Sequence, residues 1–169
     1  MAGPRVFLVG YMAAGKTSVG KALARLEGRP FVDTDALVMA LARRPVARIF
    51  AAEGEEGFRR REARALARAA RVPRAVVAVG GGAVTRPANR ALMRRSGTVV
   101  WLQASYAASA KRAAGEGGAA KRPLLSGGRA LFSKRRALYA KAAALVVRSD
   151  RGTPEAVARR LAARLKGRE

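Results

Sequence analysis

The sequence predicts an α/β fold in which helices flank a parallel sheet of five strands. Short apolar runs alternate along the chain with stretches of helical pattern, an order typical of parallel sheets. The apolar runs are continuous in Val, Leu and Phe, as expected of strands that are buried on both faces. Because 169 residues is the size of one ordinary domain, we expect residues 1–169 to form a single domain.

Five short apolar runs are predicted to be the strands. They are Arg5–Val9, Pro30–Asp33, Ala75–Val79, Thr98–Leu102 and Leu145–Arg148. Helices are predicted between them, and proline at the first position suits several of them. The predicted helices are Lys16–Leu26, Asp35–Arg44, Pro45–Ala52, Gly57–Arg71, Pro87–Arg95, Ser105–Arg112, Arg129–Ala143 and Pro154–Lys166, with an interruption around Gly54.

One segment, Ala114–Gly128, fits neither pattern. It reads AGEGGAAKRPLLSGG and is rich in glycine, with a basic pair before its proline. Loops of this length are usually functional lids or disordered linkers. Because helical and strand patterns resume directly after it, we expect a mobile lid at about residues 114–128.

The composition excludes several kinds of chemistry. The chain has no Cys and no His, so disulfides, thiol nucleophiles, histidine bases and Cys- or His-ligated metals are absent. Any reaction must therefore use carboxylates, Lys, Arg, hydroxyls, backbone amides or a hard metal ion bound by oxygen. No apolar run approaches the ~18–20 residues of a membrane span, and we expect a cytoplasmic protein with no membrane partner.

The charge balance is strongly basic, with 35 Lys and Arg against 11 Asp and Glu and a net charge of +24. Such a charge indicates either a nucleic-acid partner or a compositional bias toward Arg on solvated helix faces. The basic residues are spread along the whole chain, which favours the second interpretation. Nonspecific affinity for polyanions is expected in both cases.

The strongest motif directly follows the first predicted strand. Residues 10–17 read GYMAAGKT and match G-x-x-x-x-G-K-[ST], the phosphate-binding P-loop. Its glycines let the backbone curl so that N–H groups face one anion, and the following helix adds its dipole. Lys16 can reach the β- and γ-phosphates, and the Thr17 hydroxyl can ligate Mg²⁺. The chain therefore has a nucleotide phosphate site.

Two carboxylates, Asp33 and Asp35, follow the second predicted strand. Ligands of open α/β sheets bind at this carboxyl edge, and residues i and i+2 of a strand share a face. Both side chains are thus expected to point into one cleft. The alternative is that one of them caps the next helix. Since the chain has only 11 acids, we favour a functional role.

Two further motifs carry groups suited to an anionic ligand. Residues 58–62 read FRRRE, and either one or two of these arginines face a cleft or all lie on a solvated helix face. Gly80, Gly81 and Gly82 follow the third predicted strand. They expose backbone amides to an anion, form a tight turn, or do both.

Together these motifs resemble those of shikimate kinases, the small P-loop enzymes of chorismate and aromatic amino acid biosynthesis. The resemblance runs from Val6 to about Ala158, nearly the whole chain. A P-loop alone is shared by many unrelated proteins, but the ordered series of all these motifs is far more specific. The landmarks are GYMAAGKTSVG (10–20), FVDTD (31–35), IFAAEGEEGFRRRE (49–62), VVAVGGGAV (76–84), VVWL (99–102), KRPLL (121–125) and RRALY (135–139).

The resemblance implies a P-loop kinase fold that binds ATP and Mg²⁺. In that family, the metal is held by the residues that correspond to Thr17 and, through water, Asp33. Adenine is expected near Lys111 or Arg112, and the lid arginine, Arg122, is expected to fold over the phosphates. The implied nucleotide contacts are Gly10, Met12, Ala13, Ala14, Gly15, Lys16, Thr17, Ser18, Lys111, Arg112, Arg122 and Pro154.

The resemblance also implies the residues that bind shikimate. Asp35 is expected to contact the hydroxyls and act as the base. Arg59, supported by Glu62, and Arg135 are expected to bind the carboxylate. Contacts with shikimate at the edge of the sheet are expected to be made by Gly80, Gly81 and Gly82.

Two departures from the family pattern affect these assignments. The family pattern at this point is arginine, any residue, proline, but this chain has Arg135-Arg136-Ala137. Arg136 is therefore an alternative to Arg135 as the residue that binds the carboxylate. The strand before the glycines often ends in a hydroxyl near the metal, but Ala78 and Val79 have none.

The expected reaction is the ATP-dependent phosphorylation of the 3-hydroxyl of shikimate, with Lys16, Asp35 and Arg122 as catalytic residues. The chain is expected to act as a monomer on small molecules, with no specific nucleic-acid partner. One alternative is another small-molecule kinase such as a gluconate kinase. A second is a basic nucleic-acid-binding protein with an idle P-loop, although aromatic residues for base stacking make up only 5% of the chain.

Overall fold

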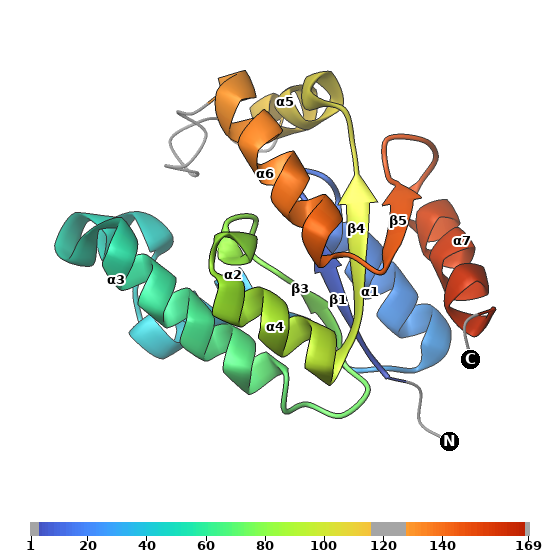
Figure 1. Cartoon of the computed structure of the whole chain (residues 1–169), viewed down its shortest axis with the longest axis horizontal. Helices are drawn as coiled ribbons and strands as arrows, with labels where there is room; N and C mark the ends of the chain where they lie inside the picture. The colour runs from blue at the N-terminus through green and yellow to red at the C-terminus, as the bar shows by residue number, and fades with distance from the viewer. Residues whose placement is uncertain (1–3, 116–127, 168–169) are drawn as a thin grey trace.

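A parallel sheet of five strands forms the centre of the computed structural model, which describes residues 4–115 and 128–167 (Figure 1). The strands lie in the order β2-β3-β1-β4-β5, and every neighbouring pair is parallel. The strands are β1 (Arg5–Val9), β2 (Phe31–Asp33), β3 (Val76–Ala78), β4 (Gly97–Gln103) and β5 (Leu145–Arg148). All five predicted strands and the α/β class are confirmed.

The helices also follow the predicted order. They are α1 (Lys16–Glu27), α2 (Thr34–Ala42), α3 (Val46–Ala69), α4 (Pro87–Ser96), α5 (Tyr106–Gly115), α6 (Gly128–Ala142) and α7 (Pro154–Lys166). The two helices predicted on either side of Gly54 form α3, and Gly54 breaks its helical geometry with φ 66° and ψ −174°. A short 3₁₀ helix that the pattern does not predict, η1 (Ala83–Thr85), follows β3.

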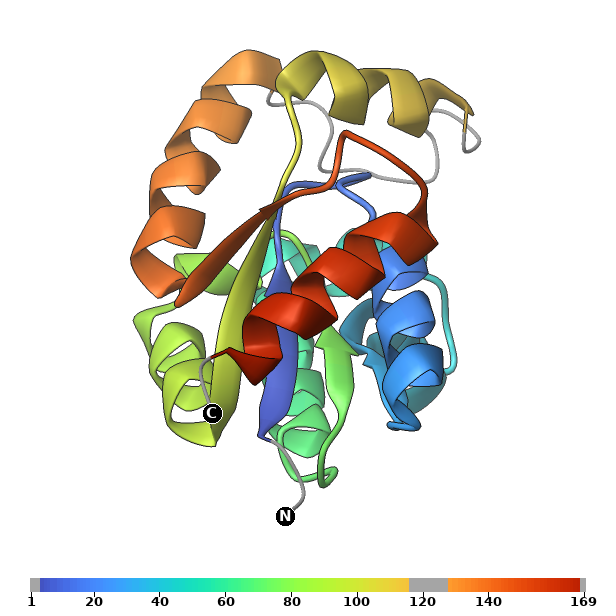
Figure 2. The ribbon, with the colours of Figure 1, turned by 90° about the vertical axis from the view of Figure 1, so that its right-hand side faces the viewer.

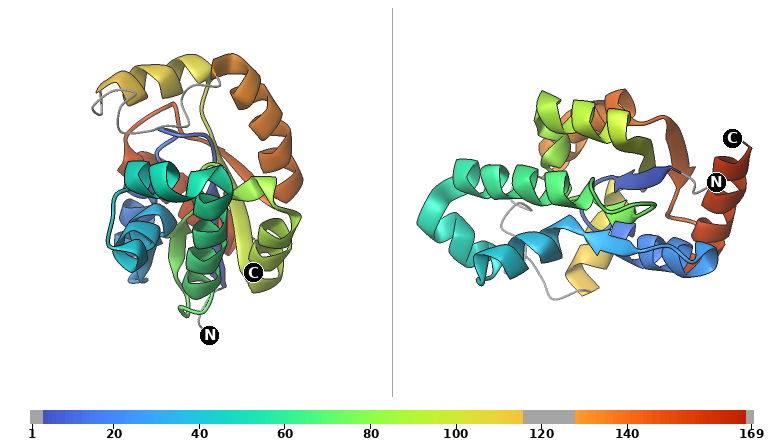
Figure 3. Two further views of the ribbon diagram at one scale, coloured as in Figure 1. Left: turned by 90° about the vertical axis from the view of Figure 1, so that its left-hand side faces the viewer. Right: turned by 90° about the horizontal axis from the view of Figure 1, so that it is seen from below.

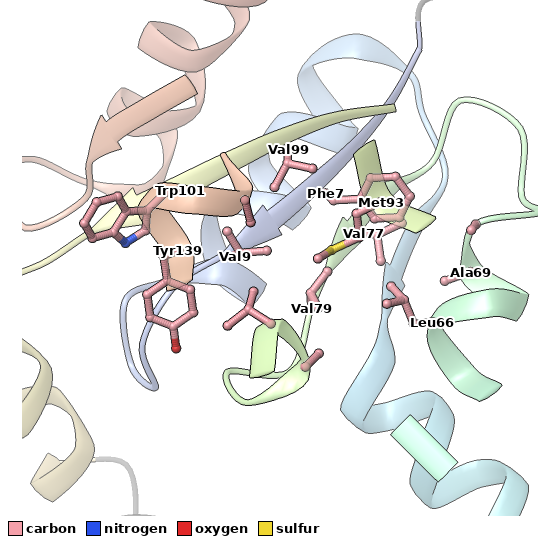
Figure 4. Packing of buried hydrophobic residues seen from close by; sticks show 14 of the residues in the cluster. Phe7, Val9, Leu66, Ala69, Val77, Val79, Met93, Val99, Trp101 and Tyr139 are labelled. Atoms are coloured by element: carbon pink, nitrogen blue, oxygen red, sulfur yellow. The ribbon is translucent and has the colours of Figure 1, made fainter. Parts of the chain in front are cut away.

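Successive β1 residues point to opposite faces of the sheet, which explains why residues 6–9 of this strand are all apolar. On one face, Val6 and Leu8 pack in a cluster with residues of α1 and α7 (Figure 2). On the other face, Phe7 and Val9 pack in a cluster with residues of α3, α4 and α6 (Figure 4). The sheet is therefore the middle layer between two apolar clusters.

A smaller apolar cluster joins α2 to α3, which lie side by side (Figure 3). Its buried members are Val38, Ile49, Phe58 and Ala65. This packing fixes the orientation of α3, which also carries Arg59 and Glu62. None of the helices in the described part of the chain combines the length and the apolar content needed to cross a membrane.

The loops after β1, β2 and β3 all leave the same edge of the sheet, because the strands are parallel. The P-loop, the Asp33–Asp35 turn and the three glycines leave this edge from adjacent positions. The structure thus brings together segments of which the ends, Gly10 and Gly82, lie 72 positions apart in the sequence. The predicted lid falls mainly on residues 116–127, outside the described residues, while Ala114 and Gly115 belong to α5 and Gly128 begins α6.

Candidate active site

The P-loop wraps tightly between β1 and α1. Gly15 adopts φ 94° immediately before the helix, a left-handed conformation that favours glycine. The Lys16 ammonium donates hydrogen bonds to the carbonyls of Gly10 and Tyr11, at 2.8 and 3.0 Å. The loop thereby holds a positive charge beside the N-terminus of α1, where a phosphate binds most favourably.

Thr17 and Asp33 meet beside the P-loop. The Thr17 hydroxyl donates a hydrogen bond of 2.7 Å to the Asp33 carboxylate. A hydroxyl and a carboxylate oxygen are hard donors, which is the ligand chemistry that Mg²⁺ requires. No group of three or more acidic side chains that could enclose a metal occurs among the residues described. The pair therefore fits a Mg²⁺ ion that takes its remaining ligands from phosphate and water.

The prediction that Asp33 and Asp35 share one strand face is wrong. Asp33 ends β2, whereas Asp35 lies in the first turn of α2. The strand stops because the Asp33 carboxylate accepts the backbone N–H groups of Asp35 and Ala36, at 3.0 and 3.2 Å, and so caps the helix. Asp35 nevertheless reaches the next strand end, since one of its carboxylate oxygens lies 2.7 Å from the position of a Cβ on Gly80.

The triple glycine makes room for charged side chains. A Cβ on Gly80 would stand 2.5 Å from a carboxylate oxygen of Glu62, and a Cβ on Gly82 would stand 2.3 Å from both terminal nitrogens of Arg59. The segment also forms the predicted tight turn, in which the Ala83 N–H donates to the Gly80 carbonyl at 3.0 Å. These glycines allow a close approach that any side chain would prevent.

Of the two roles left open for the three glycines, amides exposed to an anion and a tight turn, the first does not apply to the Gly80 amide. It donates a hydrogen bond of 2.9 Å to the hydroxyl of Thr34, which is fully buried. Ala78 and Val79 are buried and carry no hydroxyl. Thr34 therefore supplies the hydroxyl group at the end of this strand, from the neighbouring segment.

Arg59 and Glu62 form a buried ion pair beside Gly80 and Gly82. Arg59 Nη1 donates to the Glu62 carboxylate at 2.7 Å, and the two residues are only 5% and 1% exposed. Burial raises the pKa of Glu62 to about 7, although the charge of Arg59 opposes this shift. Arg59 Nη2 lies 3.5 Å from Glu55 but makes no hydrogen bond within the described structure. One buried donor of Arg59 is thus available to an anion.

Helix α6 supplies a second buried arginine. Arg135 is 3% exposed, and its Nε has no hydrogen-bond partner among the described residues, whereas Arg136 is exposed. One turn later, the Tyr139 hydroxyl donates to the carbonyl of Gly81 at 2.6 Å. Burial raises the pKa of Tyr139 above its ordinary value, so the hydroxyl keeps its proton. Tyr139 ties α6 to the triple glycine.

Tyr139 ends the RRALY landmark but is not among the predicted site residues. It stands four residues after Arg135, a spacing that places both side chains on one face of a helix. This spacing is the signal that could have identified it. Its ring is also part of the core, at 6.1 Å from the ring of Trp101 (Figure 4).

Of the two residues predicted near adenine, Arg112 lies at the P-loop and Lys111 is exposed. Arg112 donates to the carbonyl of Ala13 at 3.3 Å and to that of Ser149 at 2.9 Å. It thereby connects the P-loop to the segment that leads to Pro154, the first residue of α7. The predicted lid arginine, Arg122, lies outside the described residues.

Comparisons with known proteins agree on one family. A family model described as shikimate kinase matches residues 12–166. The shikimate kinase of Symbiobacterium thermophilum is 59% identical over 122 residues, which cover 72% of this chain and 70% of that protein. The structure of shikimate kinase from Acinetobacter baumannii in complex with shikimate superposes with a TM-score of 0.93 at 32% identity, covering 99% of this chain and 95% of that chain. A gluconokinase from Sinorhizobium meliloti has a TM-score of 0.59 at 21% identity and covers 99% of this chain and 98% of that chain, which shows a shared fold alone.

Proposed function

The chain belongs to the shikimate kinase family, and we propose how its residues carry out the ATP-dependent phosphorylation of the 3-hydroxyl of shikimate. The observation that carries this assignment is the meeting of two kinds of site at one sheet edge. A P-loop for a nucleotide lies beside two buried arginines, Arg59 and Arg135, which suit a carboxylate. A gluconate kinase shares the fold and its acceptor also carries a carboxylate, so it is the family match that favours shikimate as the acceptor.

On the nucleotide side, the P-loop amides and Lys16 bind the phosphates of ATP. The Lys16 ammonium already lies on the loop carbonyls and needs only a side-chain movement to reach the β- and γ-phosphates. Arg112 is better placed than Lys111 to contact the adenine, because its two hydrogen bonds hold it between the P-loop and the loop before α7. Met12, Ala14 and Ser18 contribute through the loop and the first turn of α1.

Thr17 and Asp33 are the residues that would hold Mg²⁺, Thr17 directly and Asp33 through water. When bound, the metal supplies positive charge that stabilises the phosphoryl group during transfer. In the described structure the two side chains are kept in place by their mutual hydrogen bond. Asp33 also caps α2, which fixes its position between the P-loop and the acceptor side.

On the acceptor side, Arg59 and Arg135 bind the carboxylate of shikimate by charge-assisted hydrogen bonds. Each has a buried nitrogen without a hydrogen-bond partner in the described structure, so each can donate to the substrate. Asp35, beside Gly80, orients the attacking hydroxyl and accepts its proton. The turn of Gly80, Gly81 and Gly82 forms the surface on which the acceptor ring rests.

Arg122 is the proposed positive group of the lid, by the resemblance to the family. It would neutralise charge on the transferring phosphoryl group, as an arginine supplied within the same chain. We further propose that the chain works as a monomer in the cytoplasm, where ATP is available. This chemistry needs no sequence-specific nucleic-acid partner.

The choice between Arg135 and Arg136 provides the test of this assignment. Arg135→Ala removes a buried donor, so the KM for shikimate should rise about 10-fold or more, the scale of a lost charge-assisted hydrogen bond. Arg136→Ala removes an exposed charge from the next position and is expected to change KM less than about twofold. The measurement is ADP release coupled to NADH oxidation, with shikimate as acceptor and gluconate as the control acceptor. Equal effects of the two substitutions, or faster turnover with gluconate, would contradict the proposal.

A further inference from the structure

A groove between α2 and α3 lies outside the site described above. The two helices lie side by side (Figure 3), and the groove between them has a volume of about 440 Å³. Its apolar residues are Val38, Leu41 and Ala67. No aromatic residue lines it, and its other lining residues are all arginines. The groove therefore has the charge of an anion-binding surface.

The four arginines follow one face of α3 and the turn after it. Arg61, Arg64, Arg68 and Arg71 stand at positions i, i+3, i+7 and i+10, a helical spacing. Arg61 is neutralised by Glu53, with hydrogen bonds between 2.7 and 3.1 Å. The other three are exposed, and within residues 4–115 and 128–167 they have no carboxylate partner. Like charges at this spacing repel one another, and a bound anion would relieve that repulsion.

This stripe faces away from the active site. At 100° per residue, Arg64 and Arg68 lie roughly 140° and 180° around the helix from Arg59. Arg59 and Glu62 are buried at the triple glycine, whereas Arg64 and Arg68 are exposed. A ligand in the groove would thus not occupy the shikimate or ATP positions.

We infer that the groove binds the phosphate backbone of a single-stranded nucleic acid. The helical rise separates Arg64 and Arg68 by about 6 Å along the axis, and the Arg71 N–H continues the turn by donating to the Arg68 carbonyl at 3.0 Å. One small anion would meet one or two of these charges, whereas an extended polyanion meets all three. The lack of aromatic residues removes a platform for base stacking, so recognition is independent of base sequence.

The test uses fluorescein-labelled dT20 and the whole chain, with binding measured by fluorescence anisotropy at several NaCl concentrations. The triple variant Arg64→Gln, Arg68→Gln, Arg71→Gln should bind about 10- to 100-fold more weakly at 100 mM NaCl. The slope of log K against log salt should fall in magnitude by about 2, since each lost phosphate contact on a single strand removes about 0.7. Polyphosphate should compete with the oligonucleotide, because the recognised group is the phosphate chain.

A matched control removes three charges elsewhere. The control variant combines Arg25→Gln, Arg159→Gln and Lys166→Gln, which change exposed residues of α1 and α7 on the opposite face of the sheet from α3. It should reduce the affinity for dT20 by less than about threefold. The shikimate kinase activity of both triple variants should match that of the unmodified chain, which also confirms folding. The single substitution Arg68→Glu repeats the test with one change in case the triple variant fails to fold.

Three results would overturn the inference. An equal loss of affinity in the control variant would show that net charge alone attracts the oligonucleotide. Displacement of dT20 by saturating ATP and shikimate would place it in the catalytic site. Failure of polyphosphate to compete would show that the phosphate chain is not the recognised group.

Discussion

Replacement of Gly82 by alanine tests whether the triple glycine positions the arginine of the acceptor site. The new Cβ would stand 2.3 Å from Nη1 and Nη2 of Arg59, whereas ordinary contacts begin near 3.4 Å. The guanidinium must therefore retreat by about 1 Å. Because the clashing atoms end a flexible side chain, Arg59 should move and the backbone should stay in place.

The expected size follows from the contacts that Arg59 makes. A shift of about 1 Å stretches its 2.7 Å hydrogen bond to Glu62 and displaces the nitrogens that we propose for the carboxylate of shikimate. Loss of one hydrogen bond to a charged group costs about 1.5–3 kcal/mol. The kcat/KM for shikimate should thus fall roughly 10- to 150-fold, mainly through KM. The steric cost to folding should be about 1 kcal/mol, which lowers Tm by about 2–4 °C in a chain of this size.

Steady-state kinetics with varied shikimate at saturating ATP, together with thermal unfolding, measure both quantities. Gly81→Ala is the matched comparison, because its Cβ would come no closer than 3.4 Å to any neighbour. It should affect KM much less than Gly82→Ala does. An unchanged KM in Gly82→Ala would refute the role of Arg59 at the carboxylate. If Gly82→Ala instead loses much more stability than predicted, the backbone, and not the Arg59 side chain, has moved.

Three other substitutions test separate parts of the site. Lys16→Ala should abolish phosphoryl transfer while leaving Tm within a few degrees, and wild-type turnover would contradict the assignment of the P-loop. Asp35→Asn should lower kcat by roughly 10²-fold with little change in ADP affinity measured by calorimetry, and a collapse of nucleotide affinity would instead place Asp35 at the metal. Burial raises the pKa of Glu62 from 4.5 to about 7, so between these pH values the folded state holds a proton that the unfolded state has released. The free energy of unfolding should therefore fall by about 3 kcal/mol as the pH rises from 4.5 to 8. Urea unfolding at both pH values should show this fall in the unmodified chain but not in Glu62→Gln, and parallel curves would contradict it.

The elements of the fold could be predicted because local pattern determines them. Every predicted strand is present, and the interruption at Gly54 appears as a residue with φ 66° inside α3. The start of α2 was predicted to within one residue, but the orientation of Asp35 was not, because Asp33 can both end a strand and cap a helix. The capping hydrogen bonds to Asp35 and Ala36 decide the outcome. Such a choice depends on backbone geometry that the residue types alone do not fix.

The site was only partly predictable for a different reason. The P-loop is a continuous segment, so its form follows from eight residues. The triple glycine acts through distant partners, since its missing side chains accommodate Arg59 and Glu62 from another helix. Tyr139 likewise reaches Gly81 across 58 positions of the sequence. Contacts between segments so far apart depend on packing, which the sequence pattern does not describe.

The order of the strands has a consequence for redesign. The residues that we propose for shikimate mostly follow β2 and β3, on one side of the P-loop strand, and those for ATP follow β1, β4 and β5. Arg135 is the exception, because α6 packs on η1 and reaches across to the acceptor side. Donor and acceptor are thus encoded in largely separate stretches of the gene. A library intended for a new acceptor would vary residues 34–86 and α6, leaving Asp33 unchanged, while ATP would remain the phosphoryl donor throughout.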